Sequence, residues 1–244
     1  MRLFRKRRAE ASPYPPTLQL YRVWQAMIEA RPGLAVPGSV ANALRGDPLV
    51  GDRLRWSTTA APPRSLEPRI DHATPRTRVG AYQQPIIAPR LIVDHLRERW
   101  PVEREAHAVF CGLLTPQREE LFASHGLLAN GRVRVVASTR GREWPGKAWD
   151  AEYFDALLGA RFALCPPGDH AWSYRFIEST LCGAIPVVFC DHPIQSSFAV
   201  LAPHELAAGR YDADVAEKNR ALAEERFGAD PQRLGAAIDA ALGP

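Results

Sequence analysis

The clearest alternation of apolar and polar segments lies in residues 162–189. A short apolar run over 162–165 is stopped by Pro166-Pro167-Gly168, which predicts a buried strand followed by a loop. A helical pattern follows over 172–182, and 185–189 has the composition of a second buried strand. Strand, loop, helix and strand form a βαβ unit, so we expect parallel strands joined by a right-handed crossover. The loop after the first strand then lies where such sheets bind ligands, beyond the strand carboxyl ends.

Residues at the two ends of the 172–182 helix support this assignment. Asp169 or Ser173 is suited to cap its start, because each side chain can accept a hydrogen bond from a free backbone amide. Gly183 stands where a helix commonly ends in a left-handed residue.

The same patterns predict further elements before and after this unit. The expected helices cover 17–30, 89–100, 115–126, 150–160, 215–226 and 231–242, and the expected strands cover 108–112 and 133–137. We expect the last two helices to pack on the sheet and close its domain. Residues 31–78 show no repeated βαβ pattern. The fold class is therefore α/β, a Rossmann-like parallel sheet flanked by helices over 101–244, after a reduced N-terminal region over 17–100.

Composition and charge narrow the class of protein. At 46% hydrophobic and 24% charged residues, the chain is ordinary for a soluble globular protein, with no apolar run long enough to span a membrane. The net charge of +4 is local, because Arg2, Arg5, Lys6, Arg7 and Arg8 carry +5 and the remainder sums to about −1. Residues 9–244 therefore lack the positive charge that is typical of a nucleic-acid-binding domain. Residues 1–16 are expected to be a disordered basic tail, either solubilising or in weak contact with an anionic inner membrane surface.

The tail lacks the apolar core of a secretory signal, so a cytoplasmic location is expected. The cysteines, Cys111, Cys165, Cys182 and Cys190, show no C-x-x-C spacing. They are interpreted as small buried apolar residues rather than metal ligands or a disulfide framework.

The chemistry of the 172–182 helix is more specific than its pattern. Arg175 and Glu178 are three residues apart and share a face, with Arg175 in the first turn beside free amides and the positive end of the helix dipole. That combination suits a nucleoside diphosphate, with Arg175 on the pyrophosphate and Glu178 on the ribose hydroxyls. The alternative is a plain Arg–Glu pair on a solvated face.

The run LCPPGDHAWSYRFIESTLCGAIPVV, residues 164–188, resembles the signature of exostosin-type glycosyltransferases (glycosyltransferase family 47), in the nucleotide-sugar-binding half of a GT-B fold. The matching parts are Pro166–Gly168, Ser173-x-Arg175-Phe176-x-Glu178 and Gly183-x-Ile185-Pro186-Val187. A looser likeness extends back to about Val109.

The resemblance implies roles for particular residues. Arg175 would hold the donor diphosphate and Glu178 the ribose, with Gly168 and Ser173 on the phosphate side. Two further positions, Gly112 and Arg118, loosely match a glycine and a basic residue that approach the donor phosphates. A last one, Asp191, stands in a turn that approaches the donor sugar or base.

For catalysis, Arg175 is the candidate for stabilising the leaving diphosphate. The nearest titratable pair is Asp169 and His170, and an imidazole suits general-base work near neutral pH. No D-x-D motif is expected, and therefore no metal dependence. No cofactor is expected either, because the GT-B sites that the resemblance implies hold phosphate with helix dipoles and cations.

The resemblance thus implies a glycosyltransferase with a nucleotide-sugar donor and a glycan or small-molecule acceptor, acting in polysaccharide biosynthesis. A full GT-B enzyme has two Rossmann-like domains, and this chain has room for one. Two alternatives stay open: a non-catalytic or partner-dependent nucleotide-sugar-binding module, and an unrelated phosphate-handling α/β protein.

Overall fold

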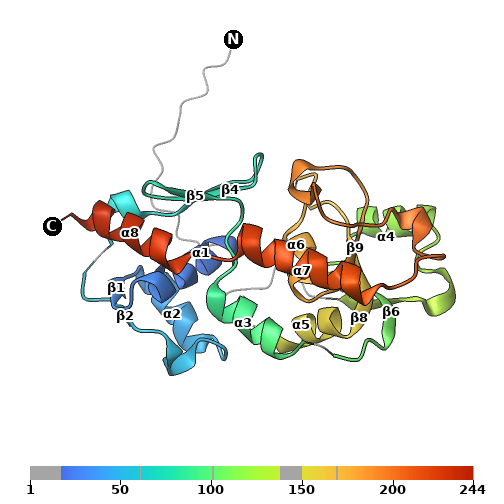
Figure 1. Ribbon diagram of the computed structural model, residues 1–244, viewed down its shortest axis with the longest axis horizontal. Coiled ribbons are helices and arrows are strands. Elements are labelled where there is room, and N and C mark those ends of the chain that lie inside the picture. Colours follow the sequence, from blue (N-terminus) through green and yellow to red (C-terminus); the bar gives the residue numbers. More distant parts are fainter. Residues whose placement is uncertain (1–17, 61, 101, 138–149, 169, 244) are drawn as a thin grey trace, which may run out of the picture.

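The computed structural model describes residues 18–60, 62–100, 102–137, 150–168 and 170–243. The expected disordered tail over 1–16 and the candidate cap and catalytic residue Asp169 lie outside the described residues. Two lobes lie side by side along the long axis of the molecule (Figure 1). We call them the N-terminal lobe and the sheet lobe.

The sheet lobe is built on four parallel strands in the order β7-β6-β8-β9. They span Ala106–Gly112 (β6), Val133–Ala137 (β7), Ala160–Cys165 (β8) and Ile185–Val188 (β9). The predicted parallel Rossmann-like sheet is confirmed. Pro186 is tolerated because β9 ends this sheet, where a missing backbone N–H costs little.

Alternate side chains of the strands fill two hydrophobic layers. Val109, Ala163 and Val188 face a core shared with α3, α5, α6 and α7. Phe110 and Leu164 face the opposite layer, which α4 and the chain around Leu206 cover. The period of two along each strand thus places the sheet between two layers.

The helices of this lobe begin and end close to the predicted positions. They are α3 (Arg90–Glu98), α4 (Pro116–Ser124), α5 (Ala151–Leu158), α6 (Tyr174–Leu181) and α7 (Ala213–Phe227), with short 3-10 turns at Ala129–Gly131 (η3), Pro193–Gln195 (η4) and Pro203–Glu205 (η5). Thr115 caps α4 as predicted, because its side chain accepts a hydrogen bond from the Arg118 amide. Pro116 follows it in the first turn of the helix. Gly183, at φ +70°, ends α6 in the left-handed conformation.

The N-terminal lobe holds elements that the sequence pattern did not predict. Besides α1 (Leu18–Ala30), it contains α2 (Gly38–Gly46), a parallel pair of β1 (Leu34–Ala35) and β2 (Trp56–Ser57), and 3-10 turns at Gly51–Arg53 (η1) and Arg64–Leu66 (η2). A three-stranded antiparallel sheet follows, with β3 (Arg69–Asp71), β4 (Arg76–Val79) and β5 (Tyr82–Gln84). This lobe has its own buried core.

The last helix, α8 (Pro231–Leu242), belongs to the N-terminal lobe, so the prediction that it packs on the large sheet was wrong. Figure 1 shows α7 along the sheet lobe and α8 continuing beside α1. Leu234 and Ile238 are fully buried against the N-terminal core. The apolar stripe of α8 was visible in the sequence, but the partner that buries it was not.

The two lobes are tied together by backbone and carboxylate hydrogen bonds. The Ala88 amide donates to the Phe227 carbonyl at 2.6 Å, and the Ala229 amide donates to the Ala88 carbonyl at 2.9 Å. From α1, the Glu29 carboxylate accepts from the Arg90 amide at 2.7 Å and the Leu91 amide at 3.3 Å, capping α3. Burial raises the pKa of Glu29 to about 7.

Candidate functional site

Four of the predicted site residues meet where β6 and β8 end and α6 begins. Gly112 ends β6, Gly168 follows β8, and Ser173 and Arg175 stand at the start of α6. Arg118 reaches the same edge from α4. The strand–loop–helix pattern determines this arrangement, because parallel strands bring their carboxyl ends to one edge.

Arg175 is held against the end of β6. Its Nε–H donates to the Cys111 carbonyl at 2.5 Å, and its guanidinium carbon lies 4.6 Å from the centre of the Phe110 ring. Gly112 makes this approach possible, because a β-carbon there would lie 2.3 Å from Arg175 Nη2. Its φ of +144° is also one that side-chain-bearing residues rarely adopt. The glycine predicted to approach phosphate therefore also makes room for the guanidinium.

Arg118 joins two loops of the site. Its guanidinium donates to the Leu113 carbonyl at 2.7 Å and to the Pro167 carbonyl at 3.3 Å. These carbonyls follow β6 and β8 respectively. The contacts position the loops around the Arg175 site.

The first turn of α6 carries buried polar atoms without a protein partner. Ser173 occupies the N-cap position, but its hydroxyl makes no capping bond. Among the described residues, Ser173 Oγ, Tyr174 Oη and Arg175 Nη1 are buried and find no hydrogen-bond acceptor or donor. Since buried polar groups are nearly always paired, three such atoms in one turn indicate that a polar ligand or water completes them.

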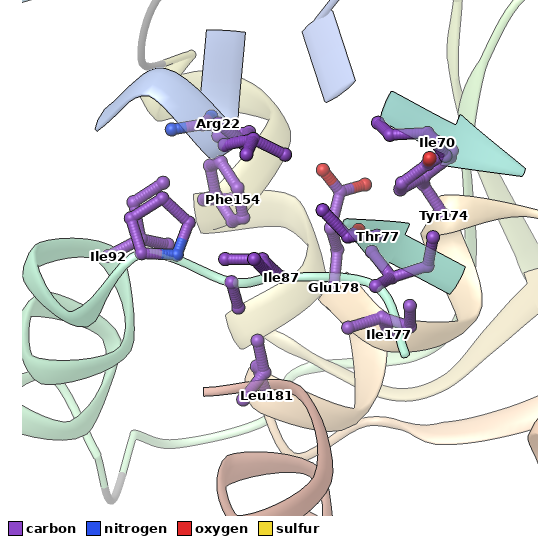
Figure 2. Close-up of a pocket in the computed structure, with 14 residues that line it drawn as sticks. Arg22, Ile70, Thr77, Ile87, Ile92, Phe154, Tyr174, Ile177, Glu178 and Leu181 are labelled. Carbon is purple, nitrogen blue, oxygen red and sulfur yellow. The ribbon is translucent and has the colours of Figure 1, made fainter. Parts of the chain in front are cut away.

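Glu178 faces a different direction from Arg175. Its carboxylate accepts a hydrogen bond from the Tyr153 hydroxyl of α5 and lines a cavity between the lobes, the inter-lobe chamber (Figure 2). Among the ion pairs of the described residues, none joins Arg175 to Glu178. The alternative of a plain Arg–Glu pair is therefore not what the structure shows.

The N-terminal lobe reaches the site through the turn between β3 and β4. His72 stacks on His170, with ring centres 5.4 Å apart and planes 2° apart. The Trp172 indole donates to the His72 carbonyl at 2.9 Å. The predicted base candidate His170 is exposed and lies under this turn. Sequence reasoning missed His72, and the only local signal is a polar turn in which Asp71 accepts from the Ala73 and Thr74 amides.

Asp191 is exposed just past β9, and no described contact brings it to Arg175. Its neighbour His192 accepts from the Ile194 amide through Nδ1 at 3.2 Å, so the neutral ring carries its proton on Nε2. Burial lowers the pKa of His192. This residue borders a groove of about 580 Å³ between the β3–β5 sheet and the start of η4.

The expectation that the chain lacks a D-x-D motif was wrong, because Asp212-Ala213-Asp214 has this spacing. The structure uses these residues as the start of a helix. Asp212 accepts from the Asp214 and Val215 amides and caps α7. Within the described ranges, no three His, Cys, Asp or Glu side chains gather as metal ligands. None of the described helices is both long and apolar enough to cross a bilayer.

All four cysteines are free. Cys111, Cys165 and Cys182 are buried in the apolar layers, as predicted, and Cys190 is partly exposed. Burial raises the pKa of the Cys165 thiol to about 11 and raises that of Cys182 as well. These thiols are therefore packing groups rather than nucleophiles.

Fold and site together define a Rossmann-like α/β protein with an arginine held at the N-terminus of a helix, beside the carboxyl ends of the parallel strands. A model of the Exostosin GT47 domain matches residues 64–222, and the chain belongs to this family of glycosyltransferases. The match begins at η2, well before the Val109 limit of the likeness seen in the sequence. A comparison with curated proteins found no match.

Proposed function

We propose that this protein transfers a sugar from a nucleotide-sugar donor to an acceptor hydroxyl, with the donor diphosphate at the N-terminus of α6. The observation that carries the proposal is the Arg175 guanidinium, fixed by Cys111 and Phe110, with Nη1 buried and without a protein partner. Family membership supports the reaction class.

Arg175 supplies the charge that the reaction requires. Breaking the bond between the sugar and the diphosphate leaves negative charge on the leaving group. A fixed guanidinium beside a helix N-terminus stabilises that charge without reorganising during the reaction. In this proposal the site needs no metal for leaving-group stabilisation, and the unpartnered Ser173 hydroxyl donates to a phosphate oxygen.

The acceptor side is assigned to the edge where the β3–β4 turn covers the α6 loop. His170 is the candidate general base there, because its exposed ring lies beside the start of α6. The stacked His72 holds that ring in place and brings the N-terminal lobe into the site. The acceptor is a glycan or a small hydroxyl compound.

Calorimetric titration with UDP and GDP tests the donor site. We expect saturable binding by the wild type and a loss of roughly 10- to 150-fold in affinity for Arg175→Ala, the worth of a hydrogen bond to a charged group. Arg132→Ala is the matched control, because Arg132 also donates to a backbone carbonyl, that of Ala207, but on the far side of the sheet lobe. Equal affinity in wild type and Arg175→Ala would refute the assignment.

A second function is a nucleotide-sugar-binding module that needs a partner for its acceptor. The N-terminal lobe favours it, because its sheets among the described residues are small: the two-stranded parallel pair of β1 and β2, and a three-stranded antiparallel sheet. Product formed only when an acceptor is added would support the enzyme. Nucleotide binding without transfer to any of a panel of glycans would support the module.

A further inference from the structure

The groove that His192 borders, of about 580 Å³, has the size of a small-molecule site. One wall consists of the β3–β4 turn and β5 of the N-terminal lobe, and the other consists of η4 and the end of α7. Gln84 joins the two walls, because its side-chain amide donates to the Gly228 carbonyl at 3.1 Å. We call this space the η4 groove.

Both walls of the η4 groove carry positive charge. Arg76 lies at the start of β4 and is exposed, and Arg226 lies in the last turn of α7. Among the described residues that line the groove, none is Asp or Glu. The ion pairs of the described residues also involve neither arginine. Since two guanidinium groups that line one groove repel each other, an anion in the groove would lower the energy.

The acid closest to Arg76 in the sheet does not supply this anion. Asp71 stands opposite Arg76 in the β3–β4 register, outside the lining of the groove. Its carboxylate accepts from the Ala73 amide at 2.9 Å and from the Thr74 amide at 3.3 Å. Asp71 is therefore used to hold the β3–β4 turn.

The polar groups of the groove are hydrogen-bond donors. Arg226 is fixed in place, because Nη1 donates to the Ser196 carbonyl at 2.6 Å and its guanidinium carbon lies 5.5 Å from the centre of the Phe198 ring. His192 adds a neutral donor, since its Nδ1 accepts from the Ile194 amide and its proton is on Nε2. Two guanidinium groups and an imidazole N–H suit the oxygens of a carboxylate or a phosphate.

The η4 groove begins beside the candidate general base. Its first lining residue, Ala73, follows His72, whose ring stacks on His170. On the other wall, the centre of the His192 ring lies 6.3 Å from that of Trp172, which donates to the His72 carbonyl. Among the described lining residues, none belongs to α6, where the donor diphosphate is assigned. A molecule in the groove is therefore placed as an acceptor rather than as a donor.

We propose that the η4 groove binds an oxyanion carried by the acceptor, a carboxylate or a phosphate, and that Arg76 and Arg226 select such acceptors. This inference rests on the proposed function and names the acceptor chemistry that it leaves open. An acidic glycan or a phosphate-bearing hydroxyl compound is then preferred over a neutral one. Because salt screens exposed charges, this preference falls as the ionic strength rises.

The test uses three probes in calorimetric titrations of the full chain at low ionic strength. An oligogalacturonate presents carboxylates, glycerol phosphate presents a phosphate, and a malto-oligosaccharide is neutral. We expect one anionic probe to bind about 10-fold or more tightly than the neutral one, and which anion binds distinguishes the two sources. Arg76→Gln should weaken that binding about 2- to 5-fold, because its side chain is exposed, and Arg226→Gln should weaken it about 10-fold.

Arg69→Gln is the matched control. Arg69 is an exposed arginine of β3, so its replacement removes the same charge from the same sheet, but it does not line the groove. This variant should bind the anionic probe like the wild type, and all three variants should bind UDP and GDP like the wild type. Urea denaturation checks Arg226→Gln, which loses the bond to Ser196. Arg76→Gln removes no side-chain hydrogen bond between described residues, so it keeps the test valid if Arg226→Gln fails to fold.

The possible failures are distinguishable. Equal affinity for the neutral and the anionic probes would overturn the inference, and so would equal losses in Arg76→Gln and Arg69→Gln, which reflect only the general surface charge. If neither anionic probe binds while UDP or GDP does, the inference fails and the donor site stands. If an anionic probe binds but neither nucleotide does, the proposed function fails, and the acceptor role of the groove with it.

Discussion

Replacing Gly112 by alanine separates the position of the Arg175 guanidinium from its chemistry. The new β-carbon would lie 2.3 Å from Arg175 Nη2, whereas non-bonded carbon contacts begin above 3 Å, so the guanidinium must move. The variant also places alanine at φ +144°, which costs about 1–3 kcal/mol. Loss of the bond to the Cys111 carbonyl adds about 1.5–3 kcal/mol to the destabilisation.

The expected result is weaker nucleotide binding, although the arginine is still present. A displaced guanidinium loses its hydrogen bond to the diphosphate, which lowers affinity for UDP or GDP roughly 10- to 150-fold by calorimetry. Urea denaturation, followed by tryptophan fluorescence, measures the loss of stability separately. The calorimetric titrations are made under conditions in which the urea curve shows that the variant is fully folded.

The control is Gly126→Ala. Gly126 also has a positive φ, +65°, but a β-carbon there would meet no atom within 4 Å. It should lose stability by about 1–2 kcal/mol and bind nucleotide like the wild type. Full affinity in Gly112→Ala, or an equal loss in Gly126→Ala, would refute the role assigned to the guanidinium.

Three further predictions concern stability. Arg104→Ala should lower the free energy of unfolding by about 3–5 kcal/mol in urea denaturation, because the Arg104 guanidinium donates to three carbonyls, those of Leu158, Ala160 and Cys182. A decrease below about 1 kcal/mol would contradict this prediction. Gly183→Ala should lower the free energy of unfolding by about 2–4 kcal/mol, since the new β-carbon would lie 1.5 Å from a Trp100 ring carbon. An unchanged urea midpoint would show that the Trp100 ring does not lie against Gly183. Folding raises the pKa of Glu29 from 4.5 to about 7, so the folded state binds a proton more tightly and stability falls as pH rises between these values, by up to about 3 kcal/mol. Urea midpoints of Glu29→Gln should lack this fall, and a parallel pH profile in both proteins would disprove it.

The central βαβ unit was predictable because its signals are local. Apolar runs of strand length, prolines and glycines after β8, and Gly183 after α6 each act within a few residues. The cap of α4 by Thr115 was found for the same reason. The edge where Gly112, Gly168 and Arg175 meet follows from this pattern, since parallel strands end together.

Other features depend on contacts between distant segments. Arg104 binds three carbonyls of the sheet lobe, yet its sequence neighbourhood gives no sign of it. The sequence around Thr77 likewise gives no sign that this residue lines the inter-lobe chamber together with residues of α6. The short strands β3, β4 and β5 carry too few apolar positions for a clear period.

The sequence by itself determined the parallel sheet, the order of its helices and the side chains available at the start of α6. Only the tertiary structure decided that α8 belongs to the N-terminal lobe, that Glu178 faces the inter-lobe chamber and that Asp212 caps α7. The reason is physical. An apolar stripe requires that a face be buried, and a polar side chain requires a partner, but neither requirement specifies which distant segment meets it.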